Sequence, residues 1–128
     1  MFTSNYARHG KDPNAVAISA NMPPWYRGKV YPPLAPTWEM VRNVNSGKIS
    51  GTQYDIMYMD LIKHRKLNAF KVVEELGENA ILLCYESPGE HCHRRLAAAW
   101  IKEHTGLDVP EKFFYDNENK LLTDLFDM

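Results

Sequence analysis

The first third of the chain contains two short apolar segments that predict β-strands. They cover residues 2–6 and 15–19, and a turn-forming run at 10–14 separates them. Between residues 22 and 36, five prolines interrupt the pattern, with three aromatic residues among them. Because proline cannot continue a helix or a central strand, we expect this stretch to be a long extended loop.

Capping signals and helical spacing predict three helices in the middle of the chain. Thr37 is placed to cap the first, and Ser50 with Gln53 forms a capping-box pattern at the start of the second. A shorter helix is expected from about residue 68 to 76, with Gly77 as its stop signal. The apolar stripe of the second helix consists of Tyr54, Met57, Tyr58, Leu61 and Ile62.

The last third begins with the most apolar strand signal. The run at 80–85 has no polar alternation, which is typical of a strand covered on both faces. The sequence Ser-Pro-Gly-Glu at 87–90 has the residues of a helix start, so a helix is predicted from there to His104. A small edge strand at 113–115 and a short amphipathic helix at 121–126 complete the pattern.

Alternation of strands and helices predicts a single α/β domain over residues 1–128. The expected architecture is a Rossmann-like three-layer fold with a mostly parallel central sheet and right-handed crossovers. Ligands of such sheets bind beyond the carboxyl ends of the central strands. Cys84 lies at that end of the strand at 80–85, so the search for a site begins there.

Composition narrows the class of protein. Lysine and arginine number 15 against 16 for aspartate and glutamate, a formal net charge of -1, so no overall field attracts nucleic acid or an anionic membrane. Apolar runs are too short to span a membrane and the first residues do not resemble a signal peptide, so we expect a cytoplasmic protein. In that reducing compartment Cys84 and Cys92 are both expected to be thiols.

The segment from Cys84 to Arg95 carries most of the candidate chemistry. Cys84 and Glu86 are two apart on the strand and are expected to share one face. The following helix opens with four potentially cationic side chains within residues 91–95, although a helix amino terminus favours acids. Either a bound anion, such as phosphate or carboxylate, or the nearby Glu86 would compensate this charge, and the sequence leaves both open.

The helical wheel assigns directions to these side chains. His93 is expected to face the sheet, and Arg94 is better placed than Arg95 to reach the site. A thiol at the start of a helix has a lowered pKa, which favours Cys92 as the more reactive cysteine, whereas Cys84 in a buried strand would be more inert.

Each of these residues also has a purely structural interpretation. Either cysteine can serve as a small core residue, and His93 can be a core histidine bonded to a backbone carbonyl. Glu86 and Arg94 can form a buried ion pair with no catalytic role.

A zinc site is the third interpretation of the segment, and we do not expect it. Its ligands would be Cys84, Cys92, His91 and His93. Successive residues of a helix point in different directions, and no second ligand pair at standard spacing exists elsewhere in the sequence. No glycine loop of a nucleotide-binding type is present either, so neither a metal nor a cofactor is expected.

The proline-rich loop offers a second set of candidate ligand contacts. Trp25 and Arg27 combine a ring with a cation, which can stack a base or sugar and hold a phosphate. Tyr6 and Asn21, each near a predicted strand end, are expected to join them. Alternatively, Trp25 and Tyr31 fold back to cover the sheet.

The run Ile81–Glu86 followed by Cys92–Arg95 resembles the signature of domain of unknown function 488 (DUF488), a family of small bacterial and phage α/β proteins. Further similarities extend along most of the chain. They are Thr3–Tyr6, the Pro24-Trp25 pair, Leu34–Trp38 and Tyr54. The resemblance implies a Rossmann-like sheet with a pocket built from these positions, and it names no reaction.

One position departs from the family pattern. Many relatives have Asp-Val-Arg after the second strand, whereas this chain has Ile18–Asn21. A role that needs this arginine therefore does not carry over, unless Arg27 takes its place.

The leading hypothesis for function is a pocket for a phosphorylated or nucleotide-type ligand, with enzymatic activity left open. Arg94 and helix amides would hold the anion. Cys92 or Cys84 would act as the nucleophile, and His93 or Glu86 would carry the proton.

Two alternatives belong to other classes of protein. One is a non-catalytic accessory module of bacterial or phage origin that recognises a nucleotide or a nucleic-acid end through Trp25, Arg27 and Arg94. The other is a structural or partner-binding protein, which a fully packed Cys84–Arg95 segment would favour. The oligomeric state is not determined by the sequence.

Overall fold

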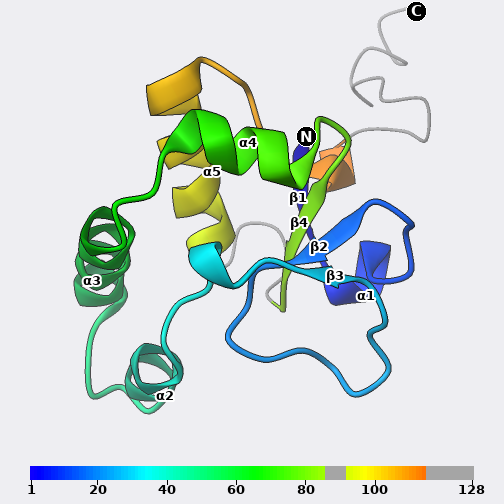
Figure 1. Ribbon diagram of the computed structural model, residues 1–128. Helices are drawn as coiled ribbons and strands as arrows, with labels where there is room; N and C mark the ends of the chain where they lie inside the picture. The colour runs from blue at the N-terminus through cyan, green and yellow to red at the C-terminus, as the bar shows by residue number, and fades with distance from the viewer. Residues whose placement is uncertain (86–91, 115–128) are drawn as a thin grey trace, which may run out of the picture.

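A four-stranded, all-parallel sheet in the order β1-β4-β2-β3 is the framework of the protein (Figure 1). The computed structural model describes residues 1–85 and 92–114. In chain order its elements are β1 (Phe2–Asn5), α1 (Tyr6–His9), β2 (Ala15–Ala17), β3 (Lys29–Val30), the 3-10 helix η1 (Pro32–Leu34), α2 (Trp38–Asn45), α3 (Gly51–His64), α4 (Ala69–Leu76), β4 (Ile81–Cys84), α5 (His93–Thr105) and the 3-10 helix η2 (Lys112–Phe114). The predicted α/β, Rossmann-like fold is therefore confirmed.

The two faces of the sheet are covered unequally. On one face, strand residues such as Val16 and Leu82 form the main core with side chains from α2, α3, α4 and α5. On the other face, Ala17 and Leu83 pack against α1 and Tyr26 of the loop after β2. Because successive strand residues point to opposite faces, one strand can serve both layers.

β4 is the central strand that the sequence predicted. All four of its residues are buried, and it pairs with β1 on one side and β2 on the other. Its register places Cys84 beside Asn5 at the carboxyl ends of the two strands. A strand with neighbours on both edges and helices over its face needs no polar residue, which is why its sequence does not alternate.

The predicted helix caps are present. The Thr37 side chain accepts a hydrogen bond from the Met40 amide at the start of α2. Ser50 and Gln53 form the reciprocal capping box of α3. Asn68 caps α4, completing the three helices expected in this region.

The stretch at 22–36 is less irregular than predicted. Lys29 and Val30 form β3, an edge strand that pairs with β2, and η1 follows it. Prolines lie on either side of these residues but not within them, so their amides remain available to the sheet. The edge strand predicted at 113–115 is also wrong, because residues 112–114 form η2, while Glu111 makes a single parallel bridge to Thr3. The helix predicted at 121–126 lies outside the described residues.

The helix after β4 begins later than predicted. α5 starts at His93, and Cys92 precedes it with an extended backbone (φ −159°, ψ 140°). The Ser-Pro-Gly-Glu signal at 87–90 lies outside the described residues. The helix ends at Thr105, one residue beyond the predicted end, and Gly106 follows it with φ 78°.

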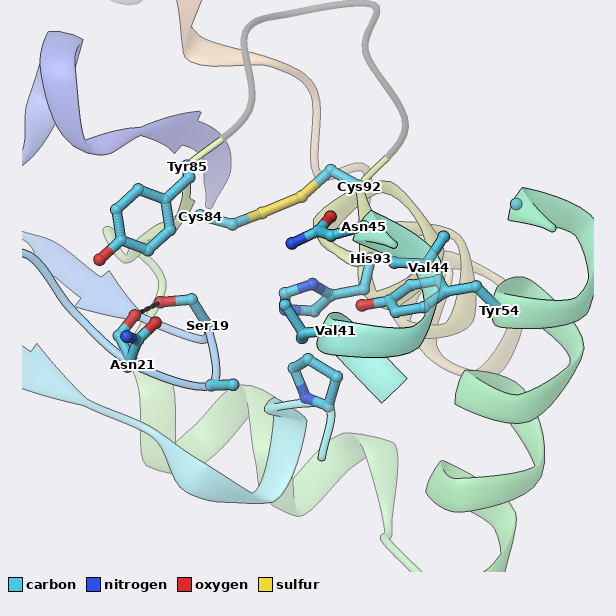
Figure 2. Close-up of a pocket in the computed structure, with 13 residues that line it drawn as sticks. Ser19, Asn21, Val41, Val44, Asn45, Tyr54, Cys84, Tyr85, Cys92 and His93 are labelled. Carbon is cyan, nitrogen blue, oxygen red and sulfur yellow. Dashed lines mark hydrogen bonds between the residues drawn. A yellow bond between two sulfur atoms is a disulfide. The ribbon is translucent and has the colours of Figure 1, made fainter. Parts of the chain in front are cut away.

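After β2 and after β4 the chain continues toward opposite edges of the sheet. From β2 it continues to the neighbouring β3, whereas from β4 it runs through α5 to Glu111, which lies beside β1. Such a divergence leaves a crevice between the two strand ends, where ligands of open α/β sheets bind. A cavity opens at this place (Figure 2).

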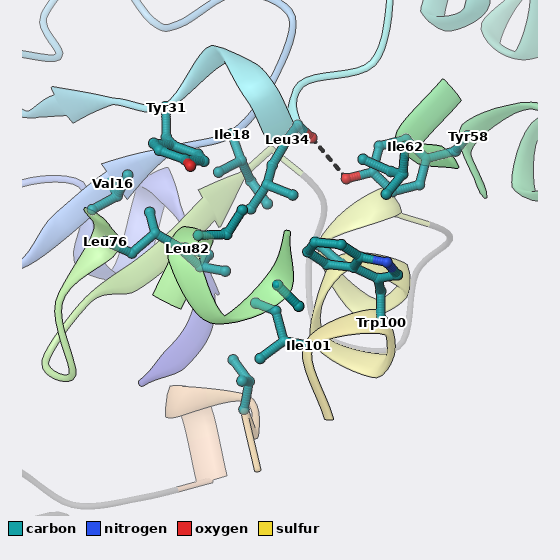
Figure 3. Close-up of a cluster of buried hydrophobic side chains, with 14 of the residues drawn as sticks. Val16, Ile18, Tyr31, Leu34, Tyr58, Ile62, Leu76, Leu82, Trp100 and Ile101 are labelled. Atoms are coloured by element: carbon teal, nitrogen blue, oxygen red, sulfur yellow. Dashed lines mark hydrogen bonds between the residues drawn. The ribbon is translucent and has the colours of Figure 1, made fainter. Parts of the chain in front are cut away.

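The main core lies beneath this cavity. Leu82 of β4, Ile18 after β2 and Ile101 of α5 are fully or almost fully buried there (Figure 3). Tyr58 of α3 reaches across to donate a hydrogen bond of 2.7 Å to the Leu34 carbonyl. This bond ties α3 to η1 and satisfies the buried Tyr58 hydroxyl.

One prediction for α3 fails. Met57, assigned to its apolar stripe, is 39% exposed, since the buried side of the helix is narrower than predicted. No helix within residues 1–85 and 92–114 is long and apolar enough to cross a membrane.

Candidate functional site

The cavity between the ends of β2 and β4 has a volume of about 540 Å³. Four parts of the chain form its wall: the segment after β2, Pro36 before α2, the facing sides of α2 and α3, and the junction of β4 with α5. Its polar side chains are Ser19, Asn21, Asn45, Tyr54, Tyr85 and His93. Pro36, Val41 and Val44 give it an apolar portion. An enclosure of this size is typical of small-molecule sites.

The wall next to β2 is held by a short chain of hydrogen bonds. The Tyr6 hydroxyl donates to the Ser19 hydroxyl at 2.5 Å, and Ser19 donates to the Asn21 carbonyl at 2.5 Å. Asn21 therefore lines the cavity as a fixed residue, in agreement with its predicted place. Tyr6 does not line it, and supports the wall from behind.

The expectation that both cysteines are thiols is wrong for this structure. A disulfide joins Cys84 at the end of β4 to Cys92 before α5, with Cα atoms 7.4 Å apart. Both residues are buried and both line the cavity. The prediction rested on an expected reducing compartment, and nothing in the sequence indicated that the chain brings the two residues together. In the structure Cys92 has an extended backbone just before α5, and its sulfur meets that of Cys84. A nucleophilic thiol in this cavity therefore requires reduction.

His93 faces the sheet as predicted. Its side chain is buried, and Nε2 donates to the Ile18 carbonyl at 2.5 Å. Burial lowers the pKa of His93 to about 4, so the imidazole is neutral at pH 7. The ring also lines the cavity, which makes His93 both a core histidine and a site residue.

Arg94 does not lie on the cavity wall, where a ligand contact was predicted. The guanidinium is fully buried, its Nε donates to Glu111 at 3.1 Å, and its Nη1 lies 3.7 Å from the Cys84 sulfur. Arg94 does not line the cavity, so it faces the disulfide from the side away from a ligand. Glu86, its predicted partner, lies outside the described residues.

Glu111 is a partner that the sequence did not reveal. It follows Arg94 by 17 residues, beyond the end of α5, and reaches it because the chain returns to β1 through the bridge to Thr3. No local pattern signals such a contact.

The sequence argument against a metal also assumed that Cys92 is helical. With Cys92 extended, the two sulfurs and one ring nitrogen of His93 lie within 4.8 Å of one another, and all three residues are buried. The expectation that these residues point in different directions, and so cannot bind one metal ion, therefore does not hold for Cys84, Cys92 and His93. His91, the fourth residue considered, lies outside the described residues.

Three residues predicted to contact a ligand do not line the cavity: Trp25, Arg27 and Arg95. Trp25 is 44% exposed and packs edge-on against Tyr6, at a centroid distance of 6.4 Å. Arg27 donates to the Pro24 and Tyr26 carbonyls, so it braces its own loop, and it does not line the cavity. Arg95 lies exposed on the outer face of α5.

Several residues of the wall were not predicted as site residues. Ser19, Asn45 and Tyr85 carried no individual signal, and Tyr54 was noted for its helical spacing and its family likeness. Asn45 belongs to α2 and Tyr54 to α3, and only the tertiary structure brings these two helices close to the end of β4.

The described part of the wall contains no lysine, arginine, aspartate or glutamate. With His93 neutral, its polar groups are amides, hydroxyls and an imidazole. At its edge α5 begins without a side-chain cap, since the Cys92 side chain makes no capping bond. Of the polar groups around the cavity, the first backbone N–H groups of α5 therefore suit an anion best.

The comparisons with known proteins give one match. Neither the curated proteins nor the solved structures include a significant match to this chain. A family model described as "Active DUF488-N3 subclade" matches residues 11–105, a span that includes β2 to α5 and every described residue of the cavity wall. The resemblance noted in the sequence is thereby confirmed: the chain belongs to the DUF488 family.

Proposed function

We propose that the cavity binds a nucleotide-type ligand and that the Cys84–Cys92 pair is the reactive element once it is reduced. The observation that carries this proposal is the position of both sulfurs and His93 on the wall of a cavity of about 540 Å³, at the divergence of β2 and β4. Ring-containing ligands of nucleoside size suit such a volume.

The chemistry of the wall supports this ligand class. Val41 and Val44 offer apolar contact to a ring, and Tyr85, about half exposed at the rim, offers a stacking face. The side-chain amides of Asn21 and Asn45 can each donate to and accept from a base edge. A phosphate would sit on the first amides of α5, because Arg94 turns away from the cavity.

The thiol chemistry depends on the redox state. In the reduced form the Arg94 guanidinium beside Cys84 would favour its thiolate, and Cys92 would lie at the start of α5. His93 would hold its proton on Nε2, leaving the other nitrogen as an acceptor. A cytoplasmic location in a bacterium or phage-infected cell would supply the reductants that keep the pair open.

Ligand titration tests the binding part of the proposal. Full-length protein, oxidised and reduced, is titrated with the common nucleosides and their monophosphates and followed by NMR and calorimetry. We expect at least one nucleoside to bind, and Asn45→Ala to weaken it roughly tenfold, the cost of about one hydrogen bond. Asn43→Ala, on the same helix but not on the cavity wall, is the matched control and should leave affinity unchanged. Absence of nucleoside and nucleotide binding at millimolar concentration would refute the pocket assignment.

A non-catalytic binding module is the second candidate, and the disulfide favours it. With both sulfurs bonded, the described wall offers no nucleophilic thiol. Chromatography of each bound nucleotide after incubation with oxidised and reduced protein separates the two candidates. Turnover that appears only after reduction and persists with a chelator present supports the thiol enzyme, whereas binding without turnover in both states supports the module.

A further inference from the structure

We propose that reduction of the Cys84–Cys92 disulfide creates a zinc site formed by Cys84, Cys92 and His93, with its fourth coordination position open to the cavity. Zinc binding itself needs only these three residues. The role of the open position rests on the proposed ligand pocket.

The spacing of the three residues fits a tetrahedral ion. Their ligand atoms lie within 4.8 Å of one another, and the Cα atoms of the cysteines are 7.4 Å apart. Zinc–sulfur bonds of about 2.3 Å at tetrahedral angles hold two sulfurs about 3.8 Å apart. Since most disulfides have Cα separations of about 4.4–6.8 Å, the wider separation here leaves room for the sulfurs to part around an ion.

His93 already has the tautomer and the supporting hydrogen bond of a metal ligand. Its Nε2 donates to the Ile18 carbonyl at 2.5 Å, so the proton is on Nε2 and the lone pair is on Nδ1. Metal-binding histidines usually have such a bond from the second nitrogen to a carbonyl or carboxylate, which fixes the ring. The ring is also buried against Tyr58, at a centroid distance of 5.2 Å, which restricts other orientations.

Arg94 would act as a positioning residue for one sulfur. Its Nη1 lies 3.7 Å from the Cys84 sulfur, and the bond from Nε to Glu111 holds the guanidinium there. Donors of this kind on a ligating sulfur orient it and reduce its negative charge. Two thiolates, one neutral imidazole and Zn²⁺ together carry no net charge, which suits a buried set of ligands.

A dithiol reductant supplies what is needed to convert the disulfide into the zinc site. The reductant supplies two electrons and two protons, the sulfur–sulfur bond breaks, and the reductant becomes a disulfide. Zn²⁺ then replaces the two thiol protons, which pass to solvent.

The open position follows from the cavity. All three ligand residues line it, so a water on the ion would face the space proposed for the ligand. Sites with three protein ligands and a water are the catalytic type of zinc site, in which the ion lowers the pKa of the water or polarises a substrate oxygen. Sites with four protein ligands are structural.

Metal titration of reduced, full-length protein tests the proposal. The protein is reduced with a phosphine and titrated with Zn²⁺ against a chromophoric chelator, and with Co²⁺ followed by absorption. We expect one ion per chain, sulfur-to-cobalt charge transfer, and a change of the cobalt bands on adding imidazole to the open position. Cys92→Ser and His93→Gln should each weaken zinc binding by more than about 100-fold. His104→Gln, on the exposed side of the same helix, is the matched control.

Alkylation of the wild-type protein tests the zinc site without any variant that could fail to fold. Treating reduced wild-type protein with iodoacetamide should abolish zinc binding, and prior addition of zinc should protect both cysteines. Absence of stoichiometric zinc binding by the reduced protein would overturn the site. Loss of zinc binding in His91→Gln, together with cobalt bands insensitive to imidazole, would overturn the open position and indicate a closed structural site.

The experiments distinguish failure of the proposed metal site from failure of the proposed ligand pocket. Zinc is measured without nucleotide, and nucleoside binding is measured on oxidised protein with a chelator present. Zinc binding without nucleoside binding would leave the metal site standing and refute the pocket. The converse would refute the metal site alone.

Discussion

The Arg94 guanidinium bridges the Cys84 sulfur, 3.7 Å from its Nη1, and the Glu111 carboxylate, 3.1 Å from its Nε. One fully buried side chain thus connects the end of β4, the start of α5 and the segment that returns beside β1. These three segments frame the disulfide on the side away from the cavity. The sequence left two ways open to compensate the cationic start of α5, a bound anion or a nearby acid. For Arg94 the structure shows an acid, Glu111.

Replacing Arg94 should therefore destabilise the fold. In Arg94→Met the carboxylate of Glu111 loses its partner while its side chain remains only 13% exposed. Removing one member of a buried pair costs about 3–5 kcal/mol in free energy of unfolding. Urea denaturation measures this loss, with Arg95→Met on the exposed face of α5 as the control. The double variant Arg94→Met with Glu111→Gln should recover part of the loss, and a single variant as stable as wild type would contradict the assignment.

His93 should make stability depend on acidity. Burial lowers its pKa in the folded protein to about 4, from 6.5 in the unfolded chain. Between these values the unfolded chain binds the additional proton, so the free energy of unfolding rises with pH and levels off above about 6.5. The full contribution is about 3 kcal/mol, lost as the pH falls from 6.5 to 4.

Urea midpoints across this pH range measure the effect. His93→Gln should flatten the slope, and His104→Gln, a surface control, should not. An unchanged slope in His93→Gln would show that other groups cause the pH dependence.

Reduction should destabilise the protein modestly. The disulfide closes a loop with a sequence separation of 8, which corresponds to about 2.5 kcal/mol of chain entropy in the unfolded state. Urea unfolding with a chelator present, with and without a phosphine reductant, measures the difference. The Cys84→Ser/Cys92→Ser double variant should be insensitive to the reductant. Equal midpoints for oxidised and reduced wild type would contradict the expectation.

The capping box of α3 should contribute measurably to stability. Ser50→Ala removes the acceptor for the Gln53 amide, 3.1 Å away, and should lower the free energy of unfolding by about 1 kcal/mol. Thr52→Ala in the same turn, where the side chain is exposed, should be close to neutral. Thermal unfolding of the two variants provides the comparison, and equal effects would argue against the cap.

Local signals were sufficient for most of the elements. The caps at Thr37, Ser50 and Asn68 satisfy amides within the same turn, so the residues that form them are three positions apart in the sequence. β4 was recognisable because burial on both faces requires an apolar run. The edge strand β3 was missed because its two residues carry too little pattern between prolines.

The sequence by itself determined the fold class, the central strand and the segment in which the chemistry lies. Only the tertiary structure decided how that segment is used: Cys92 turns to Cys84, Arg94 turns to Glu111, and α2 and α3 provide the far wall of the cavity. Caps and periodicity are set by interactions a few residues apart. The cavity is set by packing between residues such as Ser19, far along the chain from Cys84, whose proximity depends on the order of the strands.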